Sequence, residues 1–203
     1  GIFFTIFSFL SVGCSIVIAQ AIGARDSVLA KKAIHQSLFF NAILGLICAV
    51  FIFLCGDFLL ELMNIPKELL AHSKIYLHLL AICLFFDAIA IVLAAIIRVY
   101  NLVYWVMIAS FTMDLVVVSV NYYVLNYTDL ELFGVGVANI ISRFFAISIL
   151  LFVFFFKLKV KIDFKELLRL DTSVLKKILG VGVFSAGENL IWVVQYAIAF
   201  SFV

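Results

Sequence analysis

Six long apolar stretches fill most of this chain, and four of them carry one charged residue near the middle. The stretches cover residues 2–22, 37–56, 75–97, 102–126, 133–156 and 178–203. At about 1.5 Å per helical residue, each can cross a hydrocarbon core of about 30 Å. The interrupting residues are Asp87, Asp114, Arg143 and Glu188. A charge at mid-bilayer depth is costly unless it faces protein or water, so these residues predict a polar site inside a helical bundle.

The composition excludes a soluble globular domain. Hydrophobic residues make up 67% of the chain, charged residues only 13%, and the mean hydropathy is +1.30. Apolar runs of this length are predicted to be helices, because lipid offers no partner to an unpaired backbone N–H or C=O. We therefore expect an all-α integral membrane protein, a polytopic bundle with six visible spans that passes repeatedly through the inner (plasma) membrane of the cell.

The basic residues predict both an orientation and a division of the chain. Eleven of the fourteen Lys and Arg lie in the loops after the first, third and fifth stretches, and the positive-inside rule puts these loops in the cytoplasm. The first stretch then runs inward, so we expect a piece of a longer protein. Residues 1–156 form one unit, 157–177 a basic amphipathic connector on the inner leaflet, and 178–203 the first helix of a second unit. Asp171, Thr172 and Ser173 are N-cap candidates for the next helix.

Cysteine and histidine spacing gives no sign of metal binding or of catalysis. The cysteines lie in apolar stretches without a C-x-x-C pair, so we expect buried free thiols. His35, His72 and His78 lie near loop ends without ligand spacing, and we expect them to be solvated at the interface. A membrane-embedded enzyme needs a nucleophile with its base, or metal ligands, at membrane depth. The sequence shows neither, so we expect no enzyme, no metal and no cofactor.

Four motifs follow one another along almost the whole chain. They are A-Q-A-I-G-A at 19–24, L-L-E-L-M at 59–63, G-V-G-V-A-N at 134–139 and G-V-F-S-A-G-E-N-L at 182–190. In this order and spacing they resemble the multidrug and toxic compound extrusion family of cation-coupled exporters. The resemblance implies twelve helices in two six-helix lobes around a central cavity that opens alternately to either side. This chain would supply helices two to six, the lobe-joining loop and helix seven.

The sequence also departs from the family pattern. Ser110 stands where the family often has Asn, four residues before the acidic residue of helix five, and Phe184 replaces a common proline. The acidic residue of helix one, which works with helix five in the family, lies outside the chain. The identity of the coupling ion therefore cannot be read from these residues.

The intramembrane polar residues are the candidate site. We expect Asp114 to be the ion- or proton-coupling group, because a carboxylate in a low-dielectric cavity can take up and release a proton near neutral pH. Asp87 is a second coupling candidate, and a structural hydrogen bond is the alternative for both. Arg143 is expected to be a counter-charge to one of them, since an unpaired buried cation is expensive. Predicted substrate or cavity residues are Asn139, Glu188, Gln195 and Tyr196.

Three functions compete. The first is a secondary active antiporter that exports organic cations or drugs in exchange for H⁺ or Na⁺ by alternating access. The alternative is a lipid-linked oligosaccharide flippase of the same superfamily, which would need a more cationic cavity for pyrophosphate than Arg143 alone provides. A membrane-embedded enzyme ranks third. For the antiporter we expect a small amphipathic or cationic substrate, the lipid bilayer as environment, no nucleic acid, and a monomer.

Overall fold

The computed structural model describes residues 2–62, 67–127, 131–160, 162–163, 171–184 and 187. The helices are α1 (Ile2–Gly23), α2 (Ser27–Leu62), α3 (Lys67–Val99), α4 (Val103–Tyr127) and α5 (Glu131–Phe152), and α5 continues into a π-helical turn, η1 (Val153–Lys157). Each of the first five predicted stretches coincides with one helix, so the all-α prediction is confirmed. Most of the sixth stretch, residues 185–186 and 188–203, lies outside the described residues.

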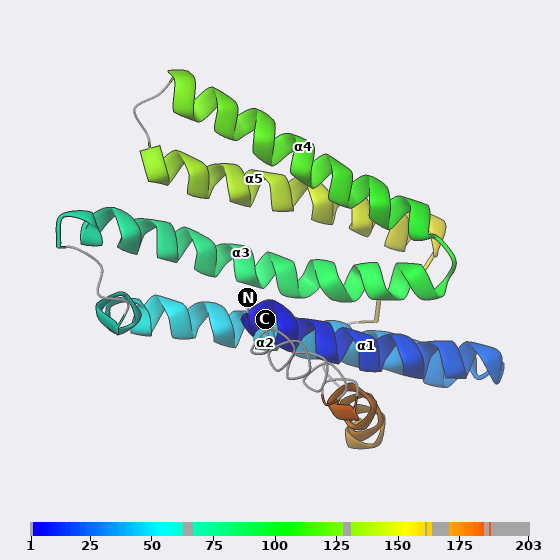
Figure 1. Cartoon of the computed structure of the whole chain (residues 1–203). Coiled ribbons are helices and arrows are strands. Elements are labelled where there is room, and N and C mark those ends of the chain that lie inside the picture. Colours follow the sequence, from blue (N-terminus) through cyan, green and yellow to red (C-terminus); the bar gives the residue numbers. More distant parts are fainter. Residues whose placement is uncertain are drawn as a thin grey trace, which may run out of the picture.

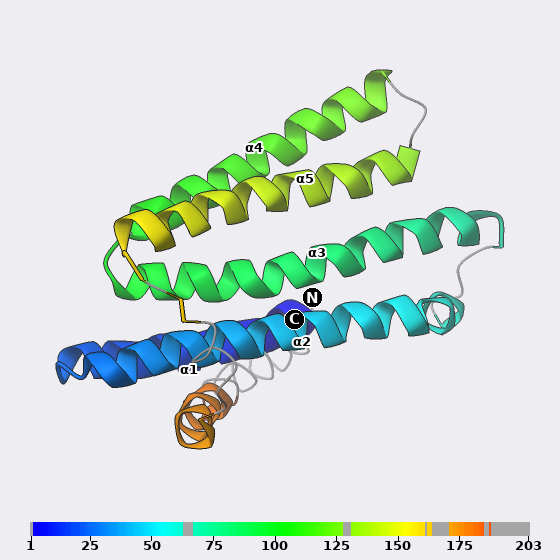
Figure 2. The same ribbon diagram turned by 180° about the vertical axis from the view of Figure 1, so that it is seen from behind.

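The helices are arranged in layers with α3 in the middle. In Figures 1 and 2, α4 and α5 lie on one side of α3, and α1 and α2 lie on the other. The long helices α2, α3, α4 and α5 are each long and apolar enough to cross a membrane. The main core lies where α3 meets α1, α2, α4 and α5, and its most buried members include Cys14, Ile18, Ile34, Val92, Leu93, Ile96 and Ile97.

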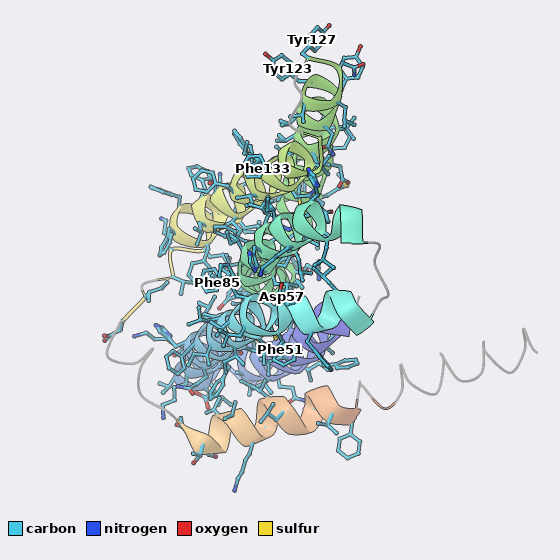
Figure 3. All side chains as sticks on the ribbon, turned by 90° about the vertical axis from the view of Figure 1, so that its left-hand side faces the viewer. Phe51, Asp57, Phe85, Tyr123, Tyr127 and Phe133 are labelled. Atoms are coloured by element: carbon cyan, nitrogen blue, oxygen red, sulfur yellow. The ribbon has the colours of Figure 1, made fainter. Side chains whose placement is uncertain are left out.

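The three basic turns lie at one end of the bundle. The turn from α1 to α2, the turn from α3 to α4, and the end of η1 meet on the same side (Figure 1). The opposite end carries exposed tyrosines, among them Tyr123 and Tyr127, which project from the end of α4 (Figure 3). This separation of basic and aromatic ends matches the pattern from which the orientation was predicted.

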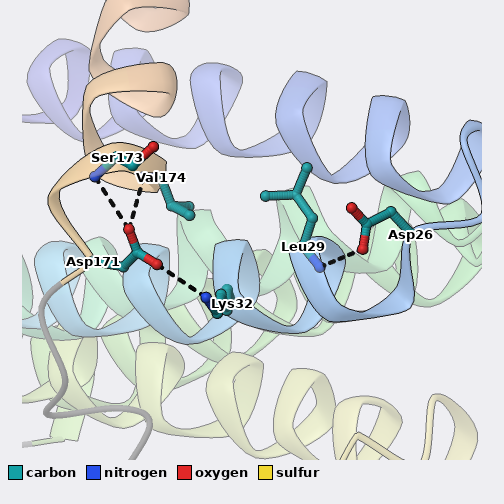
Figure 4. A network of polar contacts seen from close by, with 6 residues as sticks. All are labelled: Asp26, Leu29, Lys32, Asp171, Ser173 and Val174. Carbon is teal, nitrogen blue, oxygen red and sulfur yellow. Dashed lines mark hydrogen bonds and ion pairs between the residues drawn. The ribbon is translucent and has the colours of Figure 1, made fainter.

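The first part of the connector is not helical where it is described. Residues 158–160 and 162–163 are not helical, and residues 164–170 lie outside the described part. The next helix begins at residue 172 and is capped by Asp171, whose Oδ1 accepts hydrogen bonds from the backbone N–H groups of Ser173 (3.1 Å) and Val174 (3.3 Å). Of the three N-cap candidates, Asp171 is therefore the cap. Asp171 Oδ2 also pairs with Lys32 Nζ of α2 at 3.1 Å (Figure 4).

Two glycines allow the helix at residues 172–184 to lie directly against α1. A β-carbon added at Gly13 would collide with the carbonyl oxygen of Ile178 and lie 3.0 Å from the backbone nitrogen of Gly182. A β-carbon at Gly182 would lie 2.8 Å from the carbonyl oxygen of Phe9. Both obstacles are backbone atoms, so no side-chain movement could make room.

Candidate functional site

An ion pair joins α3 and α5 in the interior of the bundle. Arg143 Nε donates to Asp87 Oδ1 at 2.8 Å, and the two side chains are only 20% and 24% exposed. Arg143 Nη1 donates to Asn139 Oδ1 at 3.0 Å, one turn earlier on α5. The amide nitrogen of Asn139 is occupied by the carbonyl oxygen of Val135 (2.9 Å), so its Oδ1 is left facing the guanidinium. Of the two carboxylates considered as partners of Arg143, the structure brings Asp87 to it.

A glycine on α5 explains why the pair can form. A β-carbon at Gly136 would collide with the side chain of Leu79, so α5 lies close to α3 at this level. The two helices run in the same direction (Figure 1). Arg143 follows Gly136 by two turns, and Asp87 follows Leu79 by about two turns. The close approach at Gly136 therefore brings the guanidinium within reach of the carboxylate.

Asp87 also lines a cavity of about 240 Å³ between the helices. Its wall includes Ser8 of α1, Arg98 near the end of α3, and Ser110 and Met113 of α4. The cavity thus combines one carboxylate, one guanidinium and two hydroxyl groups with an apolar remainder. The family that this sequence resembles often has Asn at the position of Ser110. In the structure Ser110 lines the same cavity as Asp87.

Asp114 lies in a different environment. It is exposed on α4, as are Phe111, Leu115 and Val118 around it. The buried residues of α4 are Val106, Ala109 and Val124. No ion pair of Asp114 occurs within the part of the chain that the structure describes. The cavity expected around Asp114 is therefore not built by the described helices, and its carboxylate faces whatever covers this side of α4.

Three other predicted residues, Glu188, Gln195 and Tyr196, lie outside the described residues. The thiols of Cys14, Cys48 and Cys83 are buried, that of Cys55 is partly exposed, and all four are free. Among the described residues no group of His, Cys, Asp and Glu could hold a metal ion.

Sequence reasoning missed a set of buried polar residues on α1 and α2. Its members are Ser11, His35, Gln36, Ser37 and Asn41, each at most 3% exposed. The i, i+4 spacing of Ser37 and Asn41 was the available signal, since such residues share a helix face. The Nδ2 of Asn41 donates to the carbonyl oxygen of Ser37 at 3.0 Å.

The prediction of a solvated His35 is wrong. The ring is buried because it joins α2 to the connector: Nε2 accepts a hydrogen bond from the backbone N–H of Asp163 at 3.0 Å. Nδ1 lies 2.7 Å from the carbonyl oxygen of Lys31 and so carries the proton. His78 is also only partly exposed and stacks on Phe53 with ring centroids 4.1 Å apart, whereas His72 is exposed as expected.

Comparison with known proteins identifies the kind of molecule to which these helices belong. A family model described as MatE matches residues 1–123. The chain is 31% identical over 145 residues to the probable multidrug resistance protein YoeA of Bacillus subtilis (strain 168), which covers 70% of this chain and 30% of YoeA. It is 23% identical to the uncharacterized transporter YisQ of the same strain over 91% of this chain and 41% of YisQ. The chain therefore spans less than half the length of these relatives.

Solved structures share the fold. The inward-facing conformation of a multidrug resistance MATE family transporter of the MOP superfamily matches with a TM-score of 0.83, 23% identity, and coverage of 91% of this chain and 42% of that one. The outward-facing conformation of such a transporter matches with a TM-score of 0.81, again at 23% identity, over 93% and 42% of the two chains. Both matches concern the arrangement of the helices.

Proposed function

The chain belongs to the MatE family of multidrug and toxic compound extrusion transporters, and we propose that it is part of a secondary antiporter. The antiporter exports organic cations or other amphipathic compounds in exchange for H⁺ or Na⁺, through a cavity that opens alternately to either side. The charge balance at mid-span carries this proposal. Arg143 neutralises Asp87, which leaves Asp114 as the unbalanced charge among the described mid-span residues. A site with net negative charge favours a cation over an anion.

In this mechanism Asp114 is the coupling group. A ligand shifts a conformational equilibrium only if it binds the two states with different affinity. When ionised, Asp114 attracts Na⁺ or a cationic substrate; when protonated, it loses that attraction and the helices around it can repack. Because one carboxylate cannot hold both cations at full strength, arrival of the ion promotes release of the substrate.

The Asp87–Arg143 pair has a second role in the proposal. Asp87 contributes a carboxylate to the cavity wall, and Arg143, which also donates to Asn139, holds that carboxylate in place. Ser110 connects this cavity with the face of α4 that carries Asp114, since the two residues are one turn apart. Glu188, Gln195 and Tyr196 complete the substrate cavity from the second lobe.

Similarity to both inward-facing and outward-facing transporters supports alternating access. One arrangement of helices resembles both states over nearly the whole of this chain. This favours a movement in which the described bundle turns as one body against the remainder of the protein.

The flippase alternative is less consistent with the geometry. A pyrophosphate needs several cations that are free to bind it, and Arg143 is already bound to Asp87 and Asn139, which leaves Arg98 as the remaining cation among the described lining residues. An enzyme is disfavoured because the matched relatives are named as transporters or as a drug resistance protein.

Transport by the full-length protein tests the proposal. Everted membrane vesicles would be loaded with a pH or Na⁺ gradient, and transport of the cationic dye ethidium would be followed by fluorescence. We expect gradient-driven transport by the wild type and at least a ~10-fold loss in Asp114→Asn, which keeps the shape of the side chain but removes its titration. Asp114→Glu should retain part of the rate.

Asp57→Asn is the matched control. It makes the same chemical change at an exposed carboxylate near the end of α2, which pairs with Lys74 of α3, and it should transport at the wild-type rate. If Asp114→Asn transports ethidium at the wild-type rate between about pH 6 and pH 8, Asp114 is not the coupling group. Movement of a pyrophosphate-linked lipid without any cation transport would favour the flippase.

A further inference from the structure

A second, larger pocket lies at the basic end of the bundle. Its volume is about 500 Å³, within the range of small-molecule sites. It is bounded by the end of α1, the start of α2, the residue after α3 and the connector. Three cations line it, Arg25, Lys31 and Lys159, together with apolar side chains that include Ile22, Ile34 and Val160.

Arg25 and Lys159 give the described lining of the pocket its positive charge. No carboxylate is among the described residues that line it. Asp26 is adjacent to Arg25 in sequence, but its Oδ1 accepts a hydrogen bond from the backbone N–H of Leu29 at 2.9 Å and caps α2 (Figure 4). Ser27, the first residue of α2, also lines the pocket. The Asp26 carboxylate offsets the partial positive charge of this helix N-terminus, so the positive charge of the pocket comes from side chains, chiefly Arg25 and Lys159.

The backbone holds two of the cations in conformations that suit glycine better. Arg25 has φ = 57° and Lys159 has φ = 53°. At Arg25 the chain ends α1 in a Schellman motif, with Asp26 N–H donating to the carbonyl of Ala21 (2.8 Å) and Arg25 N–H to that of Ile22 (3.0 Å). Glycine is the usual residue at this position. Strain of this kind persists where surrounding structure imposes it, often at ligand sites, and here both strained residues bring a positive charge to one pocket.

We infer that this pocket binds a phosphate group, and that the group is the headgroup phosphate of an anionic phospholipid. Arg and Lys side chains are donors that phosphate oxygens prefer. The apolar residues beside the cations suit the glycerol and first acyl carbons of a lipid, which a free phosphate lacks. The pocket also lies where the membrane-spanning helices end, at the level of headgroups, on the side predicted to face the anionic inner leaflet.

Binding to the purified full-length protein in neutral detergent tests this site. Native mass spectrometry would titrate phosphatidylglycerol, phosphatidylcholine and inorganic phosphate in parallel. We expect phosphatidylglycerol to bind more tightly than phosphatidylcholine, and inorganic phosphate not to compete at equal concentration. Competition by inorganic phosphate that is lost in the variants below would support the phosphate site but overturn the lipid source.

Two variants remove charge without adding strain. Arg25→Gly places the preferred residue at the Schellman position, and Lys159→Asn places a residue that tolerates positive φ. Each should weaken phosphatidylglycerol binding about fivefold, and both together about 25-fold. Unchanged or raised thermal stability of the lipid-free variants would show that they fold.

The control pair is Lys176→Gln with Lys177→Gln. It removes the same charge from exposed residues of the following helix that do not line the pocket. We expect phosphatidylglycerol affinity to stay within about twofold of the wild type. Equal losses of phosphatidylglycerol affinity in both double variants would mean diffuse attraction to a basic surface and would overturn the proposal. Wild-type affinity in the Arg25 and Lys159 double variant would overturn it as well.

Discussion

Asp87 and Asp114 are the same residue type at the same depth, yet the structure places them in opposite environments. Asp87 lies twelve residues before the end of α3 and Asp114 eleven after the start of α4, so both are about 17 to 18 Å from the basic end. Asp87 lies between helices and is paired with Arg143. Asp114 is exposed on α4, without a partner in the described residues. The electrostatic environments of the two carboxylates therefore differ because of their positions within the layers, and not because of their depth.

The difference follows from the neighbours of each helix. α3 is in the middle of the bundle and contacts α1, α2 and α5, whereas α4 is at the edge and packs mainly on α5. A carboxylate on a central helix needs a partner from this chain. A carboxylate on an edge helix at mid-span depth needs cover from protein or water, because lipid would make it costly. The remaining part of the transporter is the natural source of that cover.

The largest expected effect is the loss of stability on breaking the inner pair. Arg143→Ala leaves the Asp87 carboxylate largely buried without its counter-charge, which should cost about 3 kcal/mol of unfolding free energy. Chemical unfolding of the full-length protein in detergent measures this loss. Asp87→Asn combined with Arg143→Gln should recover much of it, since no lone charge remains.

Lys74→Ala is the control for the inner pair. It breaks the 2.7 Å contact with Asp57, but both side chains are well exposed, at 44% and 60%. The expected cost is below about 0.5 kcal/mol. If Lys74→Ala and Arg143→Ala lower the free energy of unfolding by similar amounts, the ion pair inside the bundle contributes no more to stability than the one at its surface.

The next effect tests whether close helix packing positions the pair. Gly136→Val should push α5 away from α3 at Leu79 and cost about 1–3 kcal/mol, the usual range for overpacking. Gly180→Val is the matched control, because nothing lies within 4 Å of a β-carbon there. If Arg143→Ala then costs as much in the Gly136→Val background as in the wild type, the glycine does not position the pair.

The sequence predicted the fold well because length and apolarity decide it. Five stretches became five helices, the resemblance to the extrusion family is confirmed, and Asp171 caps the next helix. The partner of Arg143 was not predictable, since it depends on which helix lies beside α5. Residue spacing alone could not say that Gly136 brings α5 against α3, and so left Arg143 with two possible partners.

Position near a loop in the sequence was an equally poor guide to the burial of a side chain, because packing decides burial. His35 lies near a loop in sequence and was expected to be solvated, yet it is 1% exposed because the connector folds back over it. The same return of the chain creates the pocket that Lys159 shares with Arg25. Contacts between residues more than a hundred positions apart leave no signal in a single sequence.

A smaller effect concerns a third carboxylate, Asp171, which is paired in water rather than inside the bundle. The hydrogen bond from Lys32, followed by that from the N–H of Val174, holds the pKa of Asp171 below its usual range. The folded state thus binds this proton less tightly than the unfolded state. The stabilisation is present at neutral pH and is lost as the pH falls below about 4.

Thermal unfolding of the wild type and Asp171→Asn between about pH 3 and pH 7 checks this prediction. The wild type should be slightly more stable at neutral pH, and the difference should shrink in acid, because Asn keeps the helix cap but not the charge. A difference that is constant with pH would mean that the contact with Lys32 contributes nothing in solution.

The smallest expected effect on stability completes the comparison. Asp114→Asn should leave the free energy of unfolding within about 0.5 kcal/mol of the wild type, because the carboxylate loses no partner in the described bundle. The same variant is expected to lose transport, and normal stability with lost transport is the signature of a group that acts on a ligand.

Unfolding of full-length Asp114→Asn, measured beside Arg143→Ala, tests whether Asp114 has a structural role. A loss above about 1 kcal/mol would mean that the remainder of the protein holds Asp114 as firmly as Arg143 holds Asp87. Asp114 would then be a structural residue, and the coupling group would have to be sought elsewhere.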